Sequence, residues 1–119
     1  MCTAVTYHTR SHYFGRTLDL EHTFLEEVTV TPRRFPLPMR HLPSVKTHFA
    51  IIGMASVVEG YPLYYDACNE HGLAMAGLNF PDHAHYFPVQ EGTENVASFE
   101  LIPWLLGQSR DIHQAKEML

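Results

Sequence analysis

The second residue of the chain has the chemistry of a nucleophile. Cys2 directly follows Met1, and removal of a methionine before a small residue would leave Cys2 with a free α-amine a few bonds from its own thiol. An α-amine titrates at about 7.7–8.0 and a free thiol at roughly 8.5, so one residue can supply both a nucleophile and a base. This pattern predicts an N-terminal-nucleophile hydrolase, although a cysteine at position two also occurs by chance.

A charged pair lies a short distance further along the chain. Arg16 and Asp19 are three residues apart, on or just beyond a segment expected to pair with the Cys2 strand. In a regular strand their side chains would point to opposite faces, so the strand must end or bend near Thr17 if both are to reach Cys2. There Arg16 would favour the thiolate, and Asp19 would hold the α-amine by a charge-assisted hydrogen bond. An ordinary ion pair at a strand end explains the same spacing.

A third candidate follows an apolar segment. Asn79 lies where a side-chain amide could donate a hydrogen bond to a developing oxyanion. Phe80 and Pro81 would shape an adjoining wall. The alternative is an asparagine that ends a strand before a proline turn.

The elements that must position these residues are mainly strands. Alternating apolar and β-branched residues predict strands at 3–8, 12–18, 27–31, 48–58, 63–68 and 73–78. Turn residues predict connections at 59–60, 69–72 and 91–95. Four prolines predict an irregular loop at 32–47. The arginines of this loop could mark substrate contacts, with a solvated loop as the alternative; they are Arg33, Arg34 and Arg40.

Helices are predicted only in the last part of the chain. One covers 98–106, where Pro103 would weaken or kink it, and the other covers 109–119 with Ser109 as its N-cap. The apolar residues of the second helix fall on one face: Ile112, Ala115 and Leu119. Because this stripe runs to the last residue without a C-cap signal, we expect the natural protein to continue. Strands followed by helices indicate an antiparallel α+β fold.

Composition narrows the class of protein. The chain has 119 residues, which allows one domain at most, and a formal net charge of −5. An acidic balance argues against a nucleic-acid partner. No apolar run reaches the roughly 18 residues that a membrane helix needs. The N-terminus lacks a secretory pattern and the chain has two cysteines, so the expected location is the reducing cytoplasm.

Histidines and the second cysteine suggest other chemistry. His83 and His85 would lie on one face of a strand, but no cysteine or carboxylate cluster completes a metal site, so no metal is predicted. Cys68 lies within a predicted strand and is expected to be a small buried hydrophobic residue.

Five motifs together resemble a known family. They are Met1-Cys2-Thr3, Phe14-Gly15-Arg16-Thr17-Leu18-Asp19, Asn69-Glu70-His71-Gly72-Leu73-Ala74, Ala76-Gly77-Leu78-Asn79-Phe80-Pro81 and Glu91-Gly92-Thr93-Glu94-Asn95-Val96-Ala97. Their order and spacing over the whole chain resemble the choloylglycine hydrolases, which include bile salt hydrolases and penicillin V acylases.

The resemblance implies a role for each candidate residue. Cys2 would be the nucleophile, and Arg16 would sit beside the thiolate, help to activate it and contact the substrate. Asp19 would hold the α-amine, Asn79 would contribute to the oxyanion hole, and Phe80 would contact the substrate. The implied reaction is hydrolysis of a linear amide in a small molecule, with no metal or organic cofactor.

The resemblance also implies the architecture. Residues 1–119 would form the N-terminal portion of one domain, a four-layer αββα sandwich that assembles as a homotetramer. Relatives are longer, and their distal half would supply a further catalytic asparagine and arginine. Thr17 stands where many relatives have asparagine. Asn79 followed by Phe80 favours conjugated bile salts over penicillin V. Apolar loop residues would suit a steroid face, and core or loop packing would explain them equally well; they are Phe35, Leu37, Met39, Phe80, Tyr86 and Phe87.

Overall fold

The computed structural model describes residues 2–80 and 82–119. The predicted removal of Met1 and the wall assigned to Pro81 therefore lie outside the described residues. In chain order the elements are β1 (Thr3–His8), β2 (His12–Thr17), β3 (Glu27–Thr31), β4 (Ile51–Val58), β5 (Tyr61–Asn69), β6 (Ala74–Ala76), the 3₁₀ turn η1 (Ser98–Glu100), α1 (Leu101–Gln108) and α2 (Ile112–Met118). The predicted order of antiparallel strands followed by helices is confirmed.

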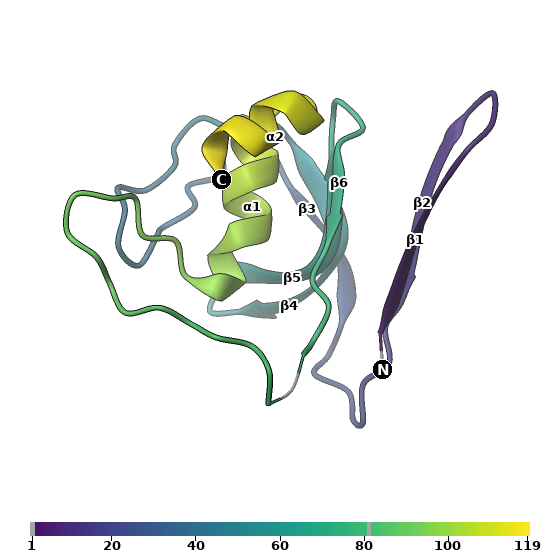
Figure 1. Cartoon of the computed structure of the whole chain (residues 1–119), viewed down its shortest axis with the longest axis horizontal. Helices are drawn as coiled ribbons and strands as arrows, with labels where there is room; N and C mark the ends of the chain where they lie inside the picture. Colours follow the sequence, from purple (N-terminus) through teal and green to yellow (C-terminus); the bar gives the residue numbers. More distant parts are fainter. Residues whose placement is uncertain (1, 81) are drawn as a thin grey trace.

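These elements form three layers. Strands β3, β4, β5 and β6 make an antiparallel sheet in that order, and β1 and β2 make a separate two-stranded sheet. The helices cover one face of the larger sheet, and the β1–β2 hairpin lies on its other side (Figure 1). The hairpin carries Cys2, so the relation between the two sheets decides what surrounds this residue.

The hairpin has two distinct faces. Its register pairs Ala4 with Arg16 and Thr6 with Phe14, and residues directly opposite each other point to the same side. These pairs face the larger sheet, since Thr6 and Phe14 line a cavity with Ile52 of β4. The other face carries exposed apolar side chains, namely Val5, Tyr7 and Tyr13.

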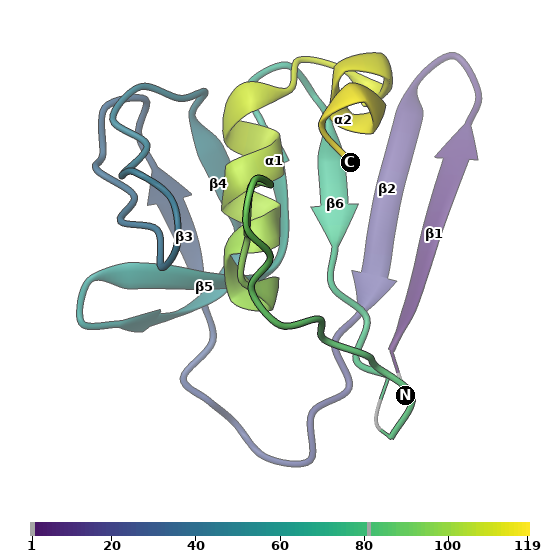
Figure 2. The same ribbon diagram turned by 60° about the vertical axis from the view of Figure 1, so that its left-hand side comes forward.

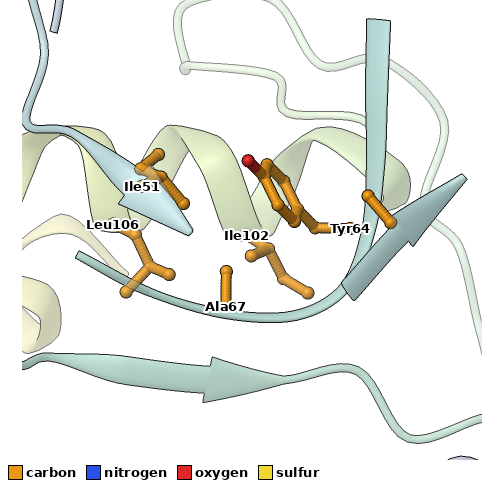
Figure 3. Close-up of a cluster of buried hydrophobic side chains, with 6 residues drawn as sticks. Ile51, Tyr64, Ala67, Ile102 and Leu106 are labelled. Carbon is orange, nitrogen blue, oxygen red and sulfur yellow. The ribbon is translucent and has the colours of Figure 1, made fainter. Parts of the chain in front are cut away.

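The larger sheet buries one face against α1. Ile51, Ala67, Ile102 and Leu106 belong to a single buried cluster that also contains Ala55 and Tyr64. Figure 3 shows these side chains between the strands and the helix. On the opposite face, Val28 and Val30 of β3 stay exposed, at 68% and 61%.

A β-bulge in β5 changes which side chains reach each face. Met54 pairs with Asp66, whereas Ala55 pairs with Tyr64. Tyr65 is therefore the extra residue. Because the alternation changes here, Tyr64 and Ala67 both reach the buried cluster, and Asp66 lies on the face that looks toward the hairpin.

Several strand ends differ from prediction, and at the start of β4 the reason is that backbone groups bond elsewhere. The strand predicted to begin at residue 48 begins at Ile51, since the N–H of His48 donates to the Arg33 carbonyl and that of Phe49 to the Gly107 carbonyl. The strand predicted at 63–68 is longer and spans Tyr61–Asn69, and the one predicted at 73–78 is shorter and spans Ala74–Ala76. The strand predicted to end at residue 18 ends at Thr17.

The helical region differs from prediction at Pro103 and at the N-cap of the last helix. Pro103 lies in the first turn of α1, where its missing N–H leaves no helical bond unmade, so the helix continues through it. The predicted N-cap Ser109 is wrong, because Ser109 is buried at the end of α1 and donates its N–H to the Leu105 carbonyl. The N-cap of α2 is Asp111, whose carboxylate accepts from the N–H groups of His113 and Gln114.

The apolar stripe predicted for the last helix is only partly buried. Ala115 packs in a second buried cluster with Trp104 and Leu105. Ile112 and Leu119 remain exposed. The stripe is therefore anchored at its centre only.

Contacts of Arg33 and Arg40 hold the proline-rich loop to residues outside it. The Arg33 guanidinium makes a bidentate hydrogen bond and ion pair with the Glu70 carboxylate. Glu100 accepts from the Arg40 N–H at 2.6 Å, and the Arg40 guanidinium lies over the Phe99 ring at 4.9 Å. Both arginines thus have structural partners.

The Arg33–Glu70 pair predicts a pH dependence of stability. The hydrogen bond from Arg33, with a second from the Ala50 N–H, lowers the pKa of Glu70 to about 2. A lowered folded-state pKa stabilises the protein above the ordinary value of 4.5, and this contribution is lost as the pH falls from there toward 2. We expect the urea midpoint to fall less steeply over this window in Glu70→Gln than in the wild type. Glu91→Gln, at an exposed turn, is the charge-matched control, and equal slopes in wild type and Glu70→Gln would contradict the assignment.

Candidate active site

Cys2 lies immediately before β1 and is half-buried. Its Sγ is 4.0 Å from the Asp19 carbonyl oxygen. Extending the alternation of β1 by two residues places Cys2 on the face of Ala4, whose partner in the register is Arg16. Cys2 and Arg16 therefore share the face of the hairpin that looks toward the larger sheet.

Arg16 is held between the two sheets. Its side chain is 6% exposed, its Nη2 donates to the Gly77 carbonyl at 2.8 Å, and its Nη1 is 3.5 Å from Oδ2 of Asp66. Within the described residues, its Nε and Nη1 have no hydrogen-bond acceptor. A buried guanidinium with spare donors is suited to an anionic or developing negative charge beside it.

Asp19 reaches the start of β1 because β2 has already ended. The Thr17 hydroxyl accepts from the Thr3 N–H at 3.1 Å and donates to the Asp19 carboxylate at 3.2 Å. The predicted end of the strand near Thr17 is confirmed. Arg16 comes before this strand end and Asp19 after it, and both residues lie near the start of β1.

Asn79 and Phe80 follow β6 in a segment without regular secondary structure. Gly77, two residues before Asn79, supplies the carbonyl that binds Arg16, so this segment passes the hairpin. The Asn79 side chain is exposed. Phe80 is 64% exposed and its ring lies 5.6 Å from the His83 ring. The oxyanion and substrate roles of these two residues stay predictions.

Sequence reasoning missed Asp66 and the Gly77 carbonyl. The available signal was that Asp66 is the charged residue of a strand whose other residues, apart from Asn69 at its end, are apolar or aromatic. A charge in a buried strand needs a partner, but the partner depends on how a bulge in β5 aims the carboxylate.

The remaining candidates are placed away from this cluster. Cys68 is half-buried on β5 and lines the cavity between the sheets, so it is less buried than predicted. His83 and His85 contact the rings of Phe80 and Phe87. Among the described residues, no three histidine, cysteine or acidic side chains lie close enough to hold a metal ion. None of the described helices has both the length and the apolar character to span a membrane.

Comparison with known proteins gives one consistent result. The family model described as linear amide C–N hydrolases, choloylglycine hydrolase family, matches residues 2–119. A bile salt hydrolase/transferase from Lactiplantibacillus plantarum is 50% identical over 117 residues, which are 98% of this chain and 36% of that protein. A conjugated bile acid hydrolase from Lactobacillus gasseri is 44% identical over 109 residues, 90% of this chain and 34% of that protein.

Solved structures agree with the sequence matches. The crystal structure of a cysteine-to-alanine mutant of conjugated bile acid hydrolase from Clostridium perfringens superposes with a TM-score of 0.90 at 32% identity, covering 100% of this chain and 37% of that one. An arginine-to-leucine variant of the same protein gives a TM-score of 0.88 at 29% identity, with the same coverage. The chain therefore spans about a third of the length of these relatives.

Proposed function

Because the chain belongs to the choloylglycine hydrolase family of linear amide C–N hydrolases, we propose that it is the N-terminal portion of a single amide hydrolase domain. The substrate class that we propose is conjugated bile salts, cleaved at the amide that joins the steroid acid to glycine or taurine. The exposed faces of the hairpin and of β3 support the domain assignment, because valine and tyrosine side chains there have no covering layer.

The observation that carries the proposal is the setting of Cys2. Its hairpin face is shared with a buried arginine, and the Asp19 segment lies against it. A guanidinium favours the thiolate over the thiol. A carboxylate beside the chain start would orient the α-amine that removal of Met1 creates.

In the proposed reaction, the Cys2 thiol gives its proton to its own α-amine and the sulfur attacks the amide carbonyl carbon. The oxygen of the tetrahedral intermediate gains negative charge, which a donor such as the Asn79 side-chain amide stabilises. Collapse breaks the C–N bond, and the α-ammonium protonates the leaving amine. Water then attacks the thioester, giving the free acid and the thiol.

The proposed substrate class is supported by the names of the relatives and by one aromatic residue. The relatives are named for bile salts or bile acids. Phe80 offers an exposed apolar ring next to Asn79, which suits a steroid face. For the complete protein we propose a cytoplasmic location and a homotetrameric assembly. Light scattering at several concentrations would test the assembly.

The proposal is tested most directly in a chimera. The chain is joined to the remaining two-thirds of the Lactiplantibacillus plantarum relative, so that its own residues supply the N-terminal part of the site. We expect release of glycine or taurine from glycocholate or taurocholate, with Met1 absent by intact mass. The parent relative and the 119-residue chain alone are the controls.

Each outcome of this assay has a separate meaning. Cleavage of penicillin V alone would keep the mechanism and change the substrate class. A folded and processed chimera that cleaves neither kind of amide, beside an active parent, would contradict the proposed activity and favour an inactive family member.

A further inference from the structure

We infer that Asp66 is a positioning residue of the candidate active site: together with the Gly77 carbonyl, it holds the Arg16 guanidinium on the Cys2 face of the hairpin. The inference rests on the proposed function in one respect, namely that Arg16 serves Cys2. The contacts that carry it come from the arrangement of the two sheets.

Among the described residues, no strand of the hairpin pairs with a strand of the larger sheet. Figure 2 shows β2 beside β6 as a separate ribbon. Within the described residues, the hydrogen bond and the ion pair that join the hairpin to the sheet segment both end on Arg16. The position of the guanidinium thus depends on Asp66 and Gly77.

The bulge in β5 aims Asp66 at the hairpin. Tyr65 is the extra residue, so Asp66 points away from α1 although Tyr64 and Ala67 point toward it. Without the bulge, keeping Tyr64 in the buried cluster would place Asp66 on the α1 face as well, because residues two apart in a regular strand share a face. Bulges commonly re-aim side chains beside functional sites.

The same bulge fixes the second acceptor. The Gly77 N–H donates to the Tyr65 carbonyl at 2.8 Å, and the Gly77 carbonyl accepts from Arg16 at 2.8 Å. The Tyr65 hydroxyl is in turn 3.0 Å from the Ser56 hydroxyl of β4. The two acceptors of Arg16 are therefore linked to each other through Tyr65, which precedes Asp66 and binds Gly77.

Burial makes the acidic partner necessary. The Arg16 side chain is 6% exposed and the Asp66 side chain 24%, so water screens their attraction less than it would at the surface. A buried guanidinium without a counter-charge is costly. Removal of the Asp66 charge should therefore let the guanidinium move toward water and away from Cys2.

Two possible roles of Asp66 predict opposite changes in the alkylation rate of Cys2 when the Asp66 charge is removed. If Asp66 were only a nearby negative charge, its removal would favour the thiolate and speed alkylation. If Asp66 positions Arg16, its removal takes the positive charge from Cys2 and slows alkylation.

The test measures alkylation of Cys2 by iodoacetamide, in which the thiolate sulfur bonds to carbon and iodide leaves. It uses the 119-residue chain with Met1 removed and with Cys68→Ala, so that one thiol reacts. We expect Asp66→Asn to slow the reaction at pH 7 by about three- to tenfold. Arg16→Met should slow it similarly, and adding Asp66→Asn to Arg16→Met should have no further effect. Asp66→Glu should recover part of the rate, and Glu91→Gln is the charge-matched control.

A faster or unchanged rate in folded Asp66→Asn would overturn the inference. If this variant fails to fold, nitrogen NMR of the wild type decides instead: resolved Arg16 guanidinium signals support a held side chain, and averaged signals overturn it. Because hydrolysis is not measured here, failure of the proposed function and failure of this inference remain distinguishable.

Discussion

Replacement of Cys2 by serine should lower amide hydrolysis by the chimera by a factor on the order of 10³ or more. Serine keeps the shape of the side chain and the neighbouring α-amine. Its hydroxyl is far less acidic than a thiol, so the same amine cannot generate a comparable nucleophile. The fold should be unaffected, because Cys2 precedes the first strand and is half-buried.

The second thiol supplies the matched control. Cys68 lies on β5 and lines the cavity between the sheets, away from the Cys2 end of the hairpin. Cys68→Ser should leave the hydrolysis rate within about twofold of the parent chimera. Intact-mass analysis after a quench should show an acyl adduct on the parent chimera and none on Cys2→Ser. A Cys2→Ser chimera that retains most of its activity would show that another group is the nucleophile.

The sequence predicted the hairpin and the placement of the charged pair around it. The alternation in 3–8 and 12–18 is local, and the expected β2 end near Thr17 follows from the requirement that Arg16 and Asp19 reach one point. Such features depend on neighbouring residues. They were therefore available without knowledge of how the sheets pack.

Other features depend on contacts that are distant in sequence. The role of Asp66 follows from an extra residue in β5, which alternation alone does not reveal. Ser109 has the type of an N-cap residue, but its N–H completes α1, and Asp111 caps α2 instead. In both cases two local patterns were compatible with the sequence, and tertiary packing selected one.

Gly53 shows how closely the fold and the site are coupled, and Gly53→Ala should strongly destabilise the protein. A Cβ at this position would lie 2.0 Å from the Asp66 carbonyl oxygen and 2.6 Å from the Ala67 Cα. These are backbone atoms of β5, which is paired with β4 on one side and β6 on the other, so they cannot move aside cheaply. We expect a loss of about 3 kcal/mol or more in the free energy of unfolding, which is a large part of typical domain stability.

Gly15→Ala is the matched control for this prediction. Gly15 also lies within a strand, but a Cβ there would meet no atom within 4 Å, so we expect a change within about 0.5 kcal/mol. Urea unfolding followed by the fluorescence of the buried Trp104 measures both variants. A Gly53→Ala midpoint equal to that of Gly15→Ala would contradict the close approach of β4 and β5. Since that approach also fixes the backbone of Asp66, a partly folded Gly53→Ala chain should show the slow Cys2 alkylation expected of Asp66→Asn.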